Sequence, residues 1–161
     1  MRAQTVFENI EFKRGRDPIR TLGIGKAAQI DKWFEKWAPY VIYEIDDNFN
    51  IYVGGSLNLF NENVTSLPDN LEVRGNLDLY GSNITSLPNN LKVRGSLYLR
   101  NTKITSLPDN LEVGGYLDIT NTNVTSLPKY LKVKGSLYIK DTEITSLPDN
   151  LKVGKYIYKD F

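Results

Sequence analysis

Residues 83–102 read NITSLPNNLKVRGSLYLRNT, and residues 103–122 repeat the same pattern as KITSLPDNLEVGGYLDITNT. Five such repeats, here called rungs, begin at Asn63, Asn83, Lys103, Asn123 and Glu143, with a constant period of 20 residues. Residues 51–62 match the second half of a rung and precede the first complete one. A fixed period of this length is typical of a solenoid in which each repeat stacks on its neighbours. We therefore expect about six stacked rungs over residues 51–161.

Each rung contains one turn and one alternating segment. From Leu71 to Leu79, apolar residues or glycine occupy every second position, which indicates a strand with one buried face. Pro68, Asp69 and Asn70 predict a turn before it, because proline restricts its own φ angle and asparagine tolerates the left-handed region. One glycine per rung falls inside the alternating segment, where a missing Cβ allows a sharp corner. These glycines, at which we expect the strand to break in two, are Gly55, Gly75, Gly95, Gly115 and Gly135.

Residues 1–50 do not follow the repeat, and we expect them to form a small α+β capping module. Apolar residues at helical spacing predict an amphipathic helix over about residues 25–38, and a hairpin is predicted over about residues 40–54. Such a module covers the apolar interior and the unpaired backbone that the end of a solenoid exposes. The apolar helix positions are Ala27, Ile30, Phe34 and Trp37, and Pro39 ends the run.

Residues 101–108, NTKITSLP, with Leu97 and Leu99 before them, resemble the short leucine-rich repeat of secreted bacterial effectors. Two features depart from that repeat: the segment after the proline reads Leu-x-Val-x-Gly, and serine or threonine stands where asparagine is usual. This variant, together with FKRGRDPIRTLGIG at residues 12–25, looks more like the leucine-rich-repeat proteins of tailed bacteriophages. The resemblance implies a leucine-rich-repeat-like solenoid of parallel strands and a phage source, but it implies no single activity. The substituted positions are Ser82, Thr102, Thr122 and Thr142.

Composition excludes several classes of function. The chain has 20 Lys and Arg against 19 Asp and Glu, a net charge of +1, which argues against a typical nucleic-acid binder. It contains no histidine and no cysteine, so imidazole bases, thiol nucleophiles and most transition-metal sites are excluded. We expect neither a cofactor nor a metal. No apolar run is long enough to form a membrane span or a signal peptide, which predicts a cytoplasmic protein that does not enter a membrane.

The residues that face outward from the strands supply the candidate binding surface. Glu72, Lys92, Glu112 and Lys132 alternate in sign between rungs, which favours a salt ladder that holds the register of the strands. Outward tyrosine and arginine are typical of protein interfaces, although tyrosine is also simply a good strand former. The candidate partner-binding residues are Tyr80, Tyr98, Arg100, Tyr116, Tyr138, Tyr156, Tyr158, Arg74, Arg94 and Lys134.

No set of residues indicates an enzyme. Asp78 and Asp118 lie two rungs apart, about 9.6 Å, near the separation of an inverting glycosidase pair, but flat rungs supply no cleft. We expect a non-catalytic protein-binding module, phage-encoded, that sterically occupies a host protein of the infected bacterium, with counter-defence as one such role. The alternatives are a structural or assembly component of a phage virion and a protein that binds single-stranded nucleic acid through the Tyr/Arg strand face.

The last rung departs from the repeat and bears on the oligomeric state. Lys155 stands in the glycine column, and Lys159 stands where an inward leucine or isoleucine belongs. Lysine on an edge strand discourages pairing with another chain. We therefore expect a monomer, with a homodimer through the C-terminal edge as the alternative.

Overall fold

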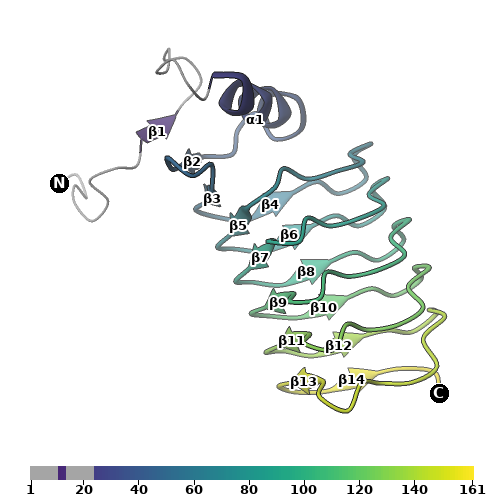
Figure 1. Ribbon diagram of the computed structural model, residues 1–161. Coiled ribbons are helices and arrows are strands. Elements are labelled where there is room, and N and C mark those ends of the chain that lie inside the picture. The colour runs from purple at the N-terminus through teal and green to yellow at the C-terminus, as the bar shows by residue number, and fades with distance from the viewer. Residues whose placement is uncertain (1–10, 14–23) are drawn as a thin grey trace.

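The computed structural model describes residues 11–13 and 24–161 (Figure 1). One helix and fourteen strands are found in these residues, and every strand is two or three residues long. The N-terminal elements are β1 (Glu11–Lys13), α1 (Ile24–Trp37), β2 (Tyr43–Ile45) and β3 (Ile51–Val53). The repeats form β4 (Leu57–Asn58), β5 (Leu71–Val73), β6 (Leu77–Asp78), β7 (Lys92–Val93), β8 (Leu97–Tyr98), β9 (Glu112–Val113), β10 (Leu117–Asp118), β11 (Lys132–Val133), β12 (Leu137–Tyr138), β13 (Lys152–Val153) and β14 (Ile157–Tyr158).

The strands form two sheets that run side by side along the stack. Sheet A has the order β1-β2-β3-β5-β7-β9-β11-β13, and sheet B has the order β4-β6-β8-β10-β12-β14. From β3 onward, neighbouring strands are parallel and pair residues 20 positions apart, such as Leu97 with Leu117. Figure 1 shows the resulting stack of rungs from teal to yellow. The prediction of a parallel β-solenoid with a 20-residue repeat is therefore confirmed.

Glycine makes the corner between the two sheets. At each corner, the backbone N–H of one glycine donates to the carbonyl of the glycine in the preceding rung, as from Gly95 to Gly75 at 3.0 Å. A Cβ on Gly95 would lie 2.6 Å from the backbone carbon and oxygen of Gly75. Only a residue without a side chain allows so close an approach. The predicted break of the strand at this column is confirmed, since β5 ends at Val73 and β6 begins at Leu77.

A second column of special residues bends the chain at the end of sheet B. Its members have positive φ angles between 53° and 66°, a region that asparagine, aspartate and glycine tolerate. In the next column, threonine hydroxyls donate to carbonyls three residues back, as from Thr102 to Leu99 at 2.7 Å. The threonines at this position therefore hold the bend of their own rungs. The residues with positive φ are Asn61, Gly81, Asn101, Asn121 and Asp141.

The interior is a continuous column of leucine, isoleucine and valine. Leu107, in the middle of the stack, is 8% exposed, as predicted for its inward position. Helix α1 covers the N-terminal end of this column (Figure 1), where Phe34 joins the core. The indole of Trp33 donates to the carbonyl of Ser66 at 3.0 Å and so ties the helix to the first complete rung. In the described residues, this helix is too short and too polar to cross a membrane.

The predicted hairpin is also present, since β2 pairs antiparallel with β3. The rings of Phe34 and Tyr43 stack with centroids 3.9 Å apart, which joins the helix to the hairpin. The Tyr43 hydroxyl donates to the Asp31 carboxylate at 2.6 Å. Burial, and then the charge and hydrogen bond of Asp31, raises the pKa of Tyr43 well above its usual range. Most of the segment 12–25, which supports the phage resemblance, lies outside the described residues.

Candidate binding faces

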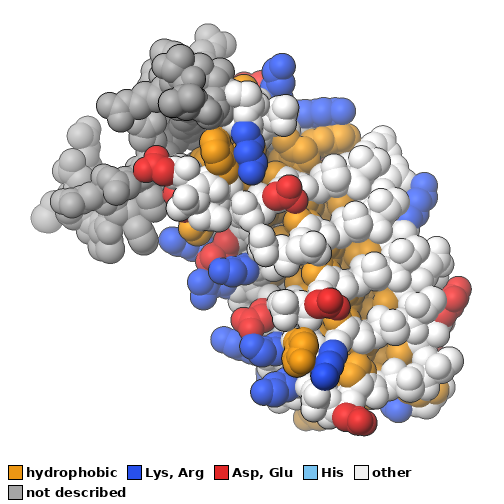
Figure 2. Space-filling view, viewed as in Figure 1, with side chains coloured by type: hydrophobic (Ala, Val, Ile, Leu, Met, Phe, Trp, Pro, Cys, Tyr) orange, Lys and Arg blue, Asp and Glu red, His pale blue; other side chains and the backbone are white. Residues whose placement is uncertain are grey.

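The candidate residues lie on two outer faces that meet at the glycine corner. Residues of the first face extend outward from sheet A, and Figure 2 shows Lys and Arg gathered along the left edge, where Figure 1 places β5 to β13. The second face belongs to sheet B and to the residues beside it. The corner turns the chain between the two, so the ten candidates do not form one strand face. Arg74, Arg94 and Lys134 lie on the first face, and the other seven lie on the second.

Four tyrosines on the second face form one connected group, here called the tyrosine cluster: Tyr116, Tyr138, Tyr156 and Tyr158. The rings of Tyr138 and Tyr158 stack at 4.5 Å, and the edge of Tyr116 meets Tyr138 at 6.2 Å. Tyr156 lies 6.3 Å from Tyr158 and is 67% exposed. The Lys155 ammonium lies 6.0 Å from the ring of Tyr116, although the sequence indicated only an edge role for this lysine. The cluster is a continuous aromatic surface over three rungs, with Tyr138 half-buried and the other three rings exposed.

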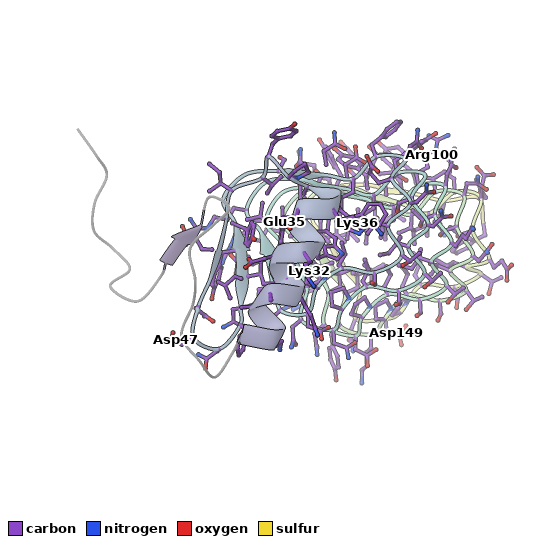
Figure 3. All side chains as sticks on the ribbon, turned by 90° about the horizontal axis from the view of Figure 1, so that it is seen from above. Lys32, Glu35, Lys36, Asp47, Arg100 and Asp149 are labelled. Carbon is purple, nitrogen blue, oxygen red and sulfur yellow. The ribbon has the colours of Figure 1, made fainter. Side chains whose placement is uncertain are left out.

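The remaining candidates of this face do not join the cluster. Tyr80 stacks on Phe60 at 5.0 Å, and its hydroxyl accepts a hydrogen bond from the Asn101 amide at 2.9 Å. Tyr98 lies half-buried between two aspartates of the neighbouring strands. Figure 3, a view along the stack, shows Arg100 and Asp149 on opposite sides of the solenoid. Phe60 is an aromatic residue that the candidate set omitted, although it stands in the same column as Tyr80.

The two carboxylates of sheet B have structural partners. Asp78 accepts the backbone N–H of Tyr80 at 3.0 Å, and Asp118 accepts that of Thr120 at 2.9 Å. Asn58 makes the same bond to Phe60 in the first rung. Each side chain therefore holds the bend of its own rung. Among the described residues, no group of three or more acidic side chains is arranged to hold a metal ion.

The outer face of sheet A carries an excess of positive charge from Arg74, Lys92, Arg94, Lys132, Lys134 and Lys152. The predicted ladder forms at one step, where Lys132 pairs with Glu112. Glu72 instead pairs diagonally with Arg94 at 2.7 Å, although Lys92 is its direct neighbour in the sheet. The hydrogen bond and charge of Lys132, and then the charges of Lys134 and Lys92, lower the pKa of Glu112. Positive charge therefore exceeds negative charge around this carboxylate.

Comparisons with protein-family models, curated proteins and solved structures give no match to this chain. The two faces therefore have to be interpreted from their own chemistry. One offers clustered aromatic rings, and the other offers an excess of positive charge.

Proposed function

We propose that this chain is a non-catalytic protein-binding module whose contact centre is the tyrosine cluster. Tyrosine supplies a large, partly polar contact area with few rotatable bonds, which makes it common at the energetic centre of interfaces. Tyr116 and Tyr158 are 40% and 39% exposed, so the rings remain accessible to a partner. The sequence contains no histidine or cysteine, and Asp78 and Asp118 are engaged in backbone hydrogen bonds, which supports a non-catalytic role.

One observation carries this proposal: Tyr116 and Tyr156 lie outside the strands, at a position that is otherwise used for bonding between rungs. At the equivalent position of other rungs, a short polar side chain accepts the backbone N–H of the next rung. Ser96 accepts from Tyr116 at 2.9 Å, and Asn76 accepts from Ser96 at 2.8 Å. No such bond links Tyr116 to Ser136 among the contacts of the described residues. The preference of tyrosine for strands does not explain these two residues, because they precede β10 and β14.

The area of the outer strand face is too small for a typical stable interface, which limits how a partner can bind. Six rungs at about 4.8 Å and five residues at about 3.3 Å give roughly 490 Å² for the outer face of the strands. A typical stable interface takes about 800 Å² from each protein. A partner centred on the tyrosine cluster must therefore also contact the turns, the N-terminal module or the other side of the glycine corner.

The resemblance to leucine-rich-repeat proteins of tailed bacteriophages extends the proposal to a biological role. In this role the chain is phage-encoded and occupies a host protein sterically in the cytoplasm of the infected cell, which fits counter-defence. A structural part of the virion is the alternative, and mass spectrometry of purified particles distinguishes the two by a fixed copy number. Single-stranded nucleic acid is less favoured, because Tyr138 and Tyr158 stack on each other and do not offer both ring faces to bases.

One double variant and one control variant test the contact centre. Tyr116→Ser with Tyr156→Ser returns both positions to the residue type of the other rungs, so thermal stability should be kept or raised while partner binding falls. Tyr130→Asn is the matched control, since Tyr130 is 54% exposed and asparagine occupies its column in other rungs. Affinity capture from cells that express the chain, quantified by mass spectrometry, compares the three proteins. Equal capture by wild type and the double variant contradicts the proposal, and loss with Tyr130→Asn alone moves the site to the turns.

A further inference from the structure

The outer face of sheet A contains a shallow open groove of about 750 Å³, which crosses β7, β9, β11 and β13. Residues two apart on a strand form its two sides. Arg94 and Lys134 stand on the side next to the glycine corner. The other side, along the strands, is lined by Lys92, Glu112, Lys132 and Lys152. We call these six residues and the space between them the basic groove.

Two glycines keep the groove open. Gly114 and Gly154 alternate with Arg94 and Lys134 in the row beside the corner. A Cβ on Gly114 would lie 1.9 Å from the Arg94 carbonyl oxygen, and one on Gly154 would lie 2.1 Å from the Lys134 carbonyl oxygen. Because the obstacle is backbone, no larger residue fits without a shift of the rung. The close backbone spacing of the rungs therefore favours glycine at positions 114 and 154, and no side chain fills the spaces beside Arg94 and Lys134.

Ion pairs among the described residues neutralise the positive charge of the basic groove only in part. Its five cations and one carboxylate give +4, and because the whole chain has only +1, the remaining residues carry −3. Lys132 pairs with Glu112 inside the groove, and Arg94 pairs with Glu72 outside it. In the described part of the chain, Lys92, Lys134 and Lys152 make no ion pair. All three side chains are exposed and available to an anionic ligand.

We propose that the basic groove binds an acidic, extended segment of a protein. The distance from β7 to β13 is three strand spacings, about 14 Å, which matches about four residues of an extended peptide. Carboxylates of such a segment complement the lysines on both sides of the groove. Leu151 and Val153, half-buried at the C-terminal end, add apolar contact for an aliphatic side chain. This site is separate from the tyrosine cluster and does not depend on the function proposed for it.

The groove fits an acidic peptide better than nucleic acid. Glu112 stands among its cations, and Glu72 lies beside them, which repels a continuous row of phosphates but leaves room for spaced carboxylates. Among the residues that the structure describes, no aromatic side chain lines the groove, so bases would find no ring on which to stack. Acidic peptide is therefore the ligand class that both the charge pattern and the lining favour.

Fluorescence anisotropy with a labelled decapeptide of alternating glutamate and serine tests the inference. Lys134→Glu with Lys152→Glu should weaken binding at least about tenfold in 50 mM salt, and 300 mM salt should weaken binding to the wild type. Lys103→Glu with Lys140→Glu is the matched control, because both lysines are exposed, lie outside the groove and give the same change in net charge. This control should change affinity less than about twofold. Lys134→Gln with Lys152→Gln replaces the first variant if charge reversal prevents folding.

Several outcomes overturn the inference. If the wild type does not bind the peptide at 1 mM protein in 50 mM salt, the basic groove is not a site for acidic peptides. Equal loss in the groove variant and the control shows that net charge alone attracts the peptide. Tighter binding of a single-stranded oligonucleotide of equal charge, lost in the groove variant, assigns the groove to nucleic acid instead. Tyr116→Ser should leave peptide affinity unchanged, so this result is independent of the proposed function.

Discussion

Gly95→Ala and Gly55→Ala add the same methyl group to the same column of the repeat, yet they should have opposite effects on stability. The Cβ of Ala at position 95 would lie 2.6 Å from the carbon and oxygen of Gly75 and 2.5 Å from the Asn76 amide oxygen. At position 55, the first corner of the stack, the added Cβ meets nothing within 4 Å. The contrast isolates the close approach of the rungs from the general effect of replacing glycine.

The magnitude follows from the distances. Ordinary contact begins near 3.4 Å, so the rungs on either side of Gly95 must separate locally by about 0.8 Å. That separation breaks the 3.0 Å hydrogen bond between Gly95 and Gly75, at about 1 kcal/mol, and adds overpacking strain of about 1 to 3 kcal/mol. In both variants, alanine lowers the conformational entropy of the unfolded chain, which raises the free energy of unfolding by about 0.4 to 1 kcal/mol. Gly95→Ala should therefore lower the free energy of unfolding by about 2 kcal/mol, whereas Gly55→Ala should raise it slightly.

The last rung shows a smaller effect of the same kind at the end of the stack, where the rung is less constrained. Lys155 places a side chain in the glycine column; its own N–H still donates to the Gly135 carbonyl at 3.1 Å, but the adjacent hydrogen bond from Tyr156 to Ser136 is 3.4 Å long. The equivalent bonds in inner rungs are 2.8 to 3.0 Å. Urea unfolding followed by circular dichroism measures both variants. The reasoning is refuted if Gly95→Ala unfolds within about 0.5 kcal/mol of wild type, or if Gly55→Ala is equally destabilising.

Three further predictions concern the core, the hairpin and the edge. Leu107→Ala should lower the free energy of unfolding by about 2 to 5 kcal/mol in the same assay, because it leaves a cavity; a change below about 0.5 kcal/mol contradicts this. Burial raises the pKa of Asp46, but hydrogen bonds from Asn50, Asn48 and Tyr52 outweigh it and hold that pKa below its usual value. Its stabilising effect is therefore present above about pH 4 and lost as the pH falls through the folded-state pKa, so the stability difference between wild type and Asp46→Asn should shrink over that range in acid titrations. Lys155→Gly with Lys159→Ile should convert a monomer into dimers or aggregates by light scattering in moderate salt, and a stable wild-type dimer would show that the edge is already an interface.

The sequence alone determined the architecture and the inward face. The period of 20 residues, the alternation around Leu77 and the glycine column are local patterns that repeat at every rung. Stacking places identical positions next to each other, so columns such as Leu107 and its equivalents can be written down without coordinates. The helix around Phe34 was equally readable, because its apolar spacing and the following Pro39 are local signals.

Only the tertiary structure decided which outward residues meet. The corner at Gly75 and its equivalents turns Arg94 and Tyr98 toward different faces, although they are only four positions apart in the chain. The pairing of Glu72 with Arg94 rather than Lys92, and the contact of Lys155 with Tyr116, depend on side-chain conformations across rungs. A repeat specifies the spacing of backbones, which is the same at every step, but a long side chain can adopt several rotamers and so reach several neighbours. Which neighbour it contacts depends on the surrounding packing, which exists only once the rungs are stacked.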